Sequence, residues 1–129
     1  YAEADNAFAA VPEILPRVAG LPTFDAVILG MGEDGHTASL FPCSAQLAAG
    51  LHDDAPAVLA AEPTSAPFQR ISLSKARLLN SRHIFLHLVG ENKFPVLQQA
   101  LADTDPMQMP IRAFLHHPLI SVDVMYSPK

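Results

Sequence analysis

Apolar residues along the chain follow two kinds of spacing, and the order of the two predicts the elements of the fold. Helical spacing covers residues 3–19 and about ten residues from Asn92 onward. Continuous or alternating apolar runs, typical of strands, cover residues 25–30, 56–61, 68–73, 83–89 and 119–125. Shorter helices are predicted at residues 44–51, 74–79 and 111–115, with Ser74 as a helix cap. Pro12 and Pro16 predict that the first helix is kinked or divided into two pieces.

The alternation of strands with helices predicts an α/β fold, because parallel strands are joined by right-handed crossovers through helices. We expect an open, mostly parallel, Rossmann-like sheet with helices on both faces. The chain has 129 residues, which is the size of a single domain. It contains no internal repeat, so residues 1–129 are interpreted as one domain.

A glycine-rich turn follows the first predicted strand and carries an acid and a histidine. Gly30, Gly32 and Gly35 allow a sharp turn and a close approach of other groups to the backbone. Asp34 and His36 would then lie beyond the carboxyl end of the strand. Open α/β sheets bind their ligands at this edge, so the turn is a candidate site.

The spacing of these glycines also fits the fingerprint of dinucleotide-binding proteins, but the residues around them argue against that function. Glu33 and Asp34 would place two negative charges where a pyrophosphate must bind. Pro42 limits the following helix to about two turns. No predicted strand brings Asp53 to a ribose either. We therefore do not expect a dinucleotide cofactor.

His36 is the candidate catalytic base, because an imidazole exchanges a proton near neutral pH. Asp34 could orient the ring or bind a substrate hydroxyl. Each residue also has a structural alternative. Histidines in loops are often exposed or structural, and an aspartate in a turn often binds backbone N–H groups.

Two cations are candidates for binding an anion such as a phosphate. Arg70 alternates with Ile71 in a predicted strand, and Lys93 follows Gly90 at the start of a helix that leaves the same edge of the sheet as His36. A lysine in the first turn of a helix is unfavourable unless an anion lies nearby. An arginine fork and a lysine point charge together suit a phosphate. The alternative is that both are solvated surface charges.

Composition excludes several classes of function. Only 8 Lys and Arg residues and a formal charge of -5 disfavour nucleic-acid binding. No apolar stretch approaches the roughly 20 residues that cross a membrane, so a cytoplasmic protein is expected. Cys43 is the single cysteine, which excludes an intrachain disulfide and a cysteine-based metal site. His83 and His87 would lie about 13 Å apart along a strand, too far to share a metal.

Three segments together resemble the 6-phosphogluconolactonases, within the superfamily that also includes glucosamine-6-phosphate isomerase/deaminase. They read LGMGEDGHTASLFP from Leu29 to Pro42, RISLS from Arg70 to Ser74, and GENK from Gly90 to Lys93. Members of this family carry an upstream half with a phosphate loop, which nothing in this chain matches. The resemblance therefore implies that the chain is the carboxyl-terminal part of a longer lactonase domain.

The resemblance also implies roles for the candidate residues. His36 would be the general base that activates water against a lactone carbonyl, and Asp34 would position the substrate or the ring. Arg70 and Lys93 would hold the 6-phosphate of a small phosphosugar lactone, and the product would be 6-phosphogluconate. No metal or organic cofactor is implied. Self-association, or pairing with an upstream segment, would complete the domain.

Phe41 distinguishes two activities of the superfamily. Deaminases carry a glutamate just before the proline of this motif, and a phenylalanine cannot perform that acid's proton chemistry. The resemblance therefore favours the lactonase over the deaminase, although Cys43 departs from the usual glycine after the proline. A noncatalytic module that binds sugar phosphates is a third possibility.

Overall fold

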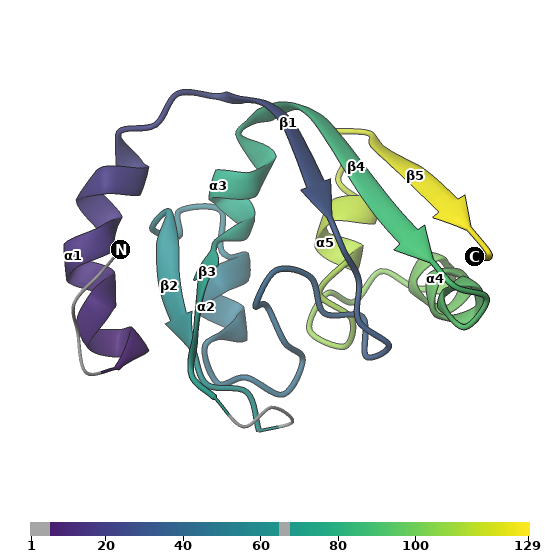
Figure 1. The fold of residues 1–129 in the computed structure, drawn as a ribbon, viewed down its shortest axis with the longest axis horizontal. Coiled ribbons are helices and arrows are strands. Elements are labelled where there is room, and N and C mark those ends of the chain that lie inside the picture. The colour runs from purple at the N-terminus through teal and green to yellow at the C-terminus, as the bar shows by residue number, and fades with distance from the viewer. Residues whose placement is uncertain (1–5, 65–67) are drawn as a thin grey trace.

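A parallel three-stranded sheet forms the centre of the fold. The computed structural model describes residues 6–64 and 68–129. Strands β1 (Phe24–Leu29), β4 (Ser81–Val89) and β5 (Val122–Ser127) lie in the order β1-β4-β5 (Figure 1). Both pairings are parallel, with Ile28 opposite Phe85 and Phe85 opposite Asp123. The predicted α/β class and parallel pairing are therefore confirmed for this sheet.

The other two strands pair in a different way from the prediction. Strands β2 (Val58–Ala61) and β3 (Arg70–Leu73) form a separate antiparallel sheet. A parallel connection needs about a dozen residues or more, usually including a helix, and the segment between Ala61 and Arg70 is shorter than this. The expectation of parallel pairing through crossovers was therefore wrong for these two strands.

Five helices are present in the described part of the chain: α1 (Ala7–Ala19), α2 (Leu47–Leu51), α3 (Lys75–Leu79), α4 (Lys93–Ala102) and α5 (Arg112–Leu115). Helix α1 continues through Pro12 and Pro16 as one element, so the alternative of two short pieces was wrong. Both prolines are exposed and lie four residues apart, where carbonyls without a helical partner can bind water. Residues 3–5 of the predicted helix lie outside the described residues.

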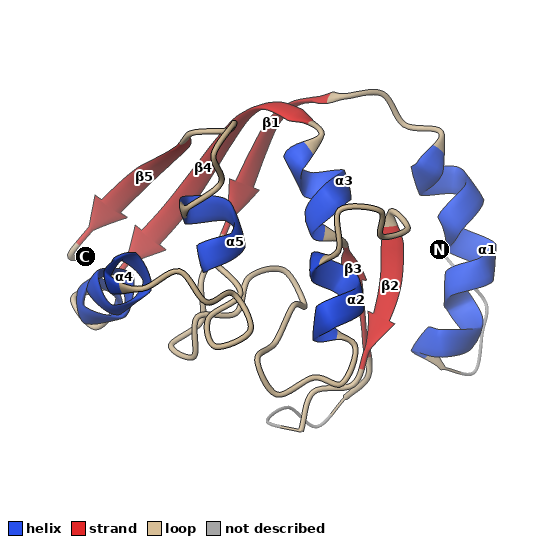
Figure 2. Ribbon diagram, turned by 180° about the vertical axis from the view of Figure 1, so that it is seen from behind, coloured by secondary structure: helices blue, strands red, loops and turns tan. Residues whose placement is uncertain are grey.

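The apolar core lies against one face of the parallel sheet. On β4, Ile84, Leu86 and Leu88 are almost completely buried, and they form one cluster with residues of α3, α4 and α5. Figure 2 shows these helices on that side of the strands. On the opposite face Ile28 is 73% exposed and Met125 is 54% exposed. Among the described residues, the helices that pack on this sheet thus lie on one face, whereas helices on both faces were expected.

Arg112, at the start of α5, is a buried cation that organises the chain after α4. Its side chain is 3% exposed, and it donates hydrogen bonds to the carbonyl oxygens of Gln99, Ala100 and Asp105. A further bond goes to the side-chain oxygen of Gln108. Carbonyls in the last turn of a helix lack helical partners, so a cation there is well placed. Arg112 thereby fixes the last turn of α4 to the loop that follows.

Candidate active site

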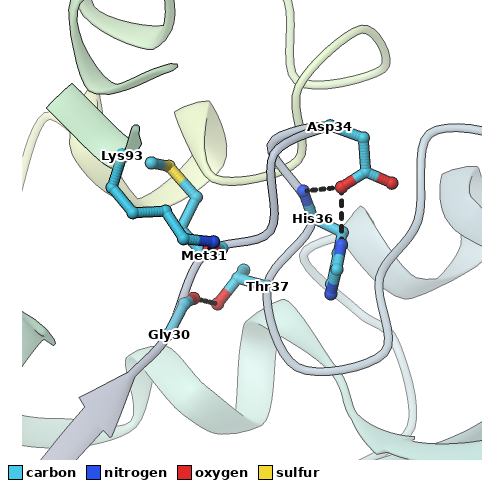
Figure 3. A network of polar contacts seen from close by, with 6 residues as sticks. All are labelled: Gly30, Met31, Asp34, His36, Thr37 and Lys93. Carbon is cyan, nitrogen blue, oxygen red and sulfur yellow. Dashed lines mark hydrogen bonds and ion pairs between the residues drawn. The ribbon is translucent and has the colours of Figure 1, made fainter. Parts of the chain in front are cut away.

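The residues after β1 form a closed turn that places Asp34 and His36 at the carboxyl end of the parallel sheet. The Thr37 hydroxyl donates a hydrogen bond of 2.8 Å to the carbonyl of Gly30 (Figure 3). The Gly32 amide donates to the carbonyl of His36 at 2.9 Å, and the Gly35 amide donates to the carbonyl of Gly32 at 3.0 Å. These bonds close the turn that follows β1.

Asp34 binds His36 twice through a single carboxylate oxygen. Oδ1 lies 2.5 Å from Nδ1 of the imidazole and also accepts the backbone N–H of His36 at 3.0 Å. Because an ionised carboxylate only accepts hydrogen bonds, the proton of the neutral ring belongs on Nδ1. Nε2 then carries the free lone pair, and Figure 3 shows this second nitrogen pointing away from Asp34. The pair therefore has the arrangement of a general base and the group that orients it.

The contacts with His36 change the pKa of the Asp34 carboxyl group. Partial burial on its own would raise its pKa, but the hydrogen bonds from the backbone and side chain of His36 outweigh this effect. The pKa of Asp34 is therefore held below its ordinary value of 3.8. The carboxylate stays ionised and keeps accepting the Nδ1 proton throughout the neutral range.

This lowered pKa predicts how stability changes in acid. A depressed carboxyl pKa contributes stability that is fully present above the unfolded-state value, near 3.8, and is lost as the pH falls through the lower folded-state value. Asp34→Asn should remove this component. We expect the urea midpoint of the variant to fall less steeply than that of the parent below about pH 4. Parallel urea titrations at several pH values measure the difference, and identical slopes would contradict the expectation.

Gly35 and Gly30 differ in whether their backbone conformation and surroundings would accept a side chain. Gly35 has a φ of +82°, and a Cβ there would lie 2.8 Å from Cβ of Met109. Gly30 has no positive φ, and a Cβ there would meet nothing within 4 Å. The conformation therefore demands glycine at position 35 but not at position 30.

Alanine substitutions at these two positions form a matched pair. Gly35→Ala is expected to lower the free energy of unfolding by about 1 to 3 kcal/mol. An alanine would be strained at the positive φ of this position, and its Cβ would be crowded by Met109. Gly30→Ala should leave it nearly unchanged. Urea unfolding monitored by circular dichroism checks both values. Equal free energies of unfolding for the two variants would contradict the prediction, because the turn would then accept a Cβ at position 35 without cost.

A second turn, after β4, reaches the first one. Because β4 is parallel to β1, its end lies beside the end of β1, and Gly90 adopts a φ of +109° there. The Lys93 ammonium donates a hydrogen bond of 2.7 Å to the carbonyl of Met31. The Asn92 amide donates to a carboxylate oxygen of Glu33, also at 2.7 Å. The predicted convergence of the two turns is thus observed.

His36 and Lys93 open into one cavity of about 500 Å³. Its wall consists of the first turn and the start of α4: Gly30, Met31, Gly32, His36, Thr37, Ala38 and Lys93. An imidazole and an ammonium group therefore line the same space, which is large enough for a small organic ligand.

Arg70 reaches His36 indirectly. Its guanidinium carbon lies 5.3 Å from the ring centroid of Phe41, and the Phe41 and His36 ring centroids are 4.2 Å apart. The side chain does not line the cavity that Lys93 shares with His36. On the same strand Ser72 is buried, and its hydroxyl accepts the backbone N–H of Ser39 at 3.0 Å. Strand β3 therefore turns a polar residue, rather than Ile71, toward the turn that carries His36.

The resemblance indicated Phe41 only as the position where deaminases carry a glutamate, and the sequence indicated neither its contact with His36 nor the role of the Met31 carbonyl. A phenylalanine five residues after a histidine carries no chemical signal, because its role depends on the path of the intervening loop. A backbone carbonyl carries no residue-type signal at all. In residues 6–64 and 68–129 there is no cluster of three or more metal-ligating side chains and no helix long and apolar enough to cross a membrane.

The fold and the site define an α/β domain that presents an acid–histidine pair and a cation at the carboxyl ends of parallel strands. The sequence profile of the glucosamine-6-phosphate isomerases/6-phosphogluconolactonases matches residues 1–121. The chain belongs to this family.

Individual relatives agree with this assignment. A 6-phosphogluconolactonase of Pseudomonas putida is 43% identical, over 99% of this chain and 52% of its own length. One of Rhizobium meliloti is 36% identical, over 99% of this chain and 56% of its own. The crystal structure of a 6-phosphogluconolactonase from Shewanella baltica superimposes with a TM-score of 0.91 at 48% identity, covering 96% of this chain and 53% of that one. The chain thus spans about half the length of these relatives.

Proposed function

We propose that the protein hydrolyses 6-phospho-D-glucono-1,5-lactone to 6-phosphogluconate, with His36 as the general base. The observation that carries this proposal is that His36, which is paired with Asp34, lines one cavity together with Lys93. The names of the relatives support the substrate. We assign the reaction to the cytoplasm, because a chain with Cys43 as its single cysteine suits a reducing compartment.

The proposed reaction uses the two ring nitrogens of His36 in different ways. Asp34 accepts the Nδ1 proton, so Nε2 takes a proton from a water molecule while the water oxygen bonds to the lactone carbonyl carbon. The tetrahedral intermediate then breaks the bond between that carbon and the ring oxygen. The imidazolium, stabilised by Asp34, returns its proton to the departing ring oxygen. A lactone is an activated ester, so one positioned base suffices, and the proposal requires no cofactor.

Lys93 and Arg70 are proposed to hold the 6-phosphate. Lys93 faces the cavity, and Arg70 lies against the ring that His36 contacts. A charged hydrogen bond to a phosphate contributes enough binding energy that Lys93→Met and Arg70→Ala should each raise KM about tenfold or more. Steady-state kinetics over a range of lactone concentrations measure this. Arg82→Ala, an exposed cation at the other end of β4, is the matched control and should leave KM unchanged.

An unchanged KM in both site variants would contradict the phosphate-binding role. A large fall in kcat without a rise in KM would instead place these cations near the reacting carbonyl.

One assay separates the lactonase from the alternatives. The protein expressed from its complete gene is given 6-phosphogluconolactone and, separately, glucosamine 6-phosphate. Acid release from the lactone is expected. Ammonia as the main product would establish the deaminase instead, and binding of phosphosugars without turnover would establish a noncatalytic module. Phe41 favours the first outcome, because it brings no second carboxylate to His36.

A further inference from the structure

We propose that Phe41 is a positioning residue for His36, and that its ring sets the plane in which the imidazole presents Nε2 to the cavity. This inference rests on the proposed role of His36 as the base. It concerns how that base is held and which reaction it can perform.

Phe41 is suited to this role because it is itself held firmly. Its side chain is 4% exposed, so it occupies one defined place in the fold. The imidazole stacks on it with an angle of 24° between the rings and 4.2 Å between their centroids. The guanidinium of Arg70 lies over the same ring at 5.3 Å. Stacked rings and a cation on an aromatic ring are both attractive arrangements.

The other contacts of His36 leave one motion of its ring uncontrolled. The hydrogen bond from Nδ1 to Asp34 fixes the position of one nitrogen, but the ring can still tilt about that bond. Gly32 lies on the same side of the ring, because a Cβ built there would have Cε1 and Nδ1 of His36 as its nearest atoms. Stacking on Phe41 opposes the tilt, because tilting would separate the two ring faces. The three contacts together fix the direction of Nε2.

The chemistry of Phe41 matters as much as its shape. A phenyl ring has no hydrogen-bonding group, so it competes neither with Asp34 for Nδ1 nor with a water molecule for Nε2. A carboxylate at this position would offer the imidazole a second acceptor. Phe41 therefore leaves one oriented nitrogen free to take a proton from water, which suits hydrolysis.

The test uses Phe41→Leu and Phe41→Met, which keep an apolar side chain and remove the ring. In the protein expressed from its complete gene, each should lower kcat for the lactone about tenfold and leave KM within twofold, because a misplaced base slows the chemical step and not binding. In a His36→Ala background the same substitutions should cause no further loss. Leu47→Ala, a buried core variant on α2, is the control and should lower the unfolding midpoint while keeping kcat.

Proton NMR provides a readout that a general packing role would not change. The His36 Cε1 proton should show an upfield ring-current shift and NOEs to Phe41 in the parent, and the shift should disappear in the leucine and methionine variants. A retained kcat, an added loss in the His36→Ala background, or the absence of NOEs in the parent would each overturn the proposal. A parent that does not hydrolyse the lactone would overturn the proposed function instead, and the NMR measurements would then decide the positioning alone. If neither variant folds, the NOEs between His36 and Phe41 in the parent decide whether Phe41 positions His36.

Discussion

His36→Ala is expected to reduce kcat for lactone hydrolysis by about 10³-fold, because it removes the group that takes the proton from water. The affinity for 6-phosphogluconate should stay within a few fold, since Lys93 and Arg70 are unchanged. Activity is measured by acid release, and affinity by calorimetry. This variant tests the central element of the proposed mechanism.

His83→Ala is the matched control, because it removes an exposed histidine from β4. It should have the kcat of the parent. If His36→Ala keeps more than a tenth of the parent's kcat, His36 is not the base. If both kcat and affinity disappear, unfolding must be excluded by circular dichroism before the result is interpreted.

Gly32→Ala is expected to lower kcat about 10²-fold without changing any group that takes part in the reaction. A Cβ at this position would overlap both Cε1 and Nδ1 of His36. Non-bonded atoms cannot approach this closely, so we expect the imidazole to move away from Asp34. The free energy of unfolding should change less than in Gly35→Ala, because Gly32 has no positive φ.

Gly20→Ala is the control for this substitution. A Cβ there would have its nearest neighbour at 3.8 Å, which is an ordinary contact. Its kcat should equal that of the parent. If Gly32→Ala also has full activity, the contact between Asp34 and His36 is not required for the reaction, and the proposed orientation of the base is wrong.

The parallel sheet and the convergence of the two turns could be predicted from the sequence, because both depend on local patterns. The apolar run of β1 and the longer run of β4 indicate buried strands, and helices between them imply parallel pairing. When two parallel strands are also adjacent in the sheet, as β1 and β4 are, the turns at their carboxyl ends are neighbours. The placement of Lys93 beside the turn of His36 follows from this rule and from the adjacency of β1 and β4.

The rest of the site depends on packing that no local pattern encodes. The antiparallel sheet fits a short connection. On β3 the buried residue is Ser72 and not Ile71, and the Ser72 hydroxyl accepts the backbone N–H of Ser39. Arg70 lies on the same face of β3 as Ser72, so the burial of that face decides whether Arg70 contacts Phe41 or water. Phe41 and His36 meet because of the loop between them, whose shape is set by contacts that are distant in the sequence.

Helix α4 has a consequence for the motion of the site. Its first residue, Lys93, holds the carbonyl of Met31, and its last turn is bound by Arg112. Next to Arg112, the Ile111 amide donates to the carbonyl of Gly35 at 2.9 Å. The turn is therefore attached directly to the first residue of α4 and, through Ile111 and Arg112, to its last turn. A displacement of either end of α4 would act on the same turn, so a substitution near Ala102 can reach His36 without touching the cavity.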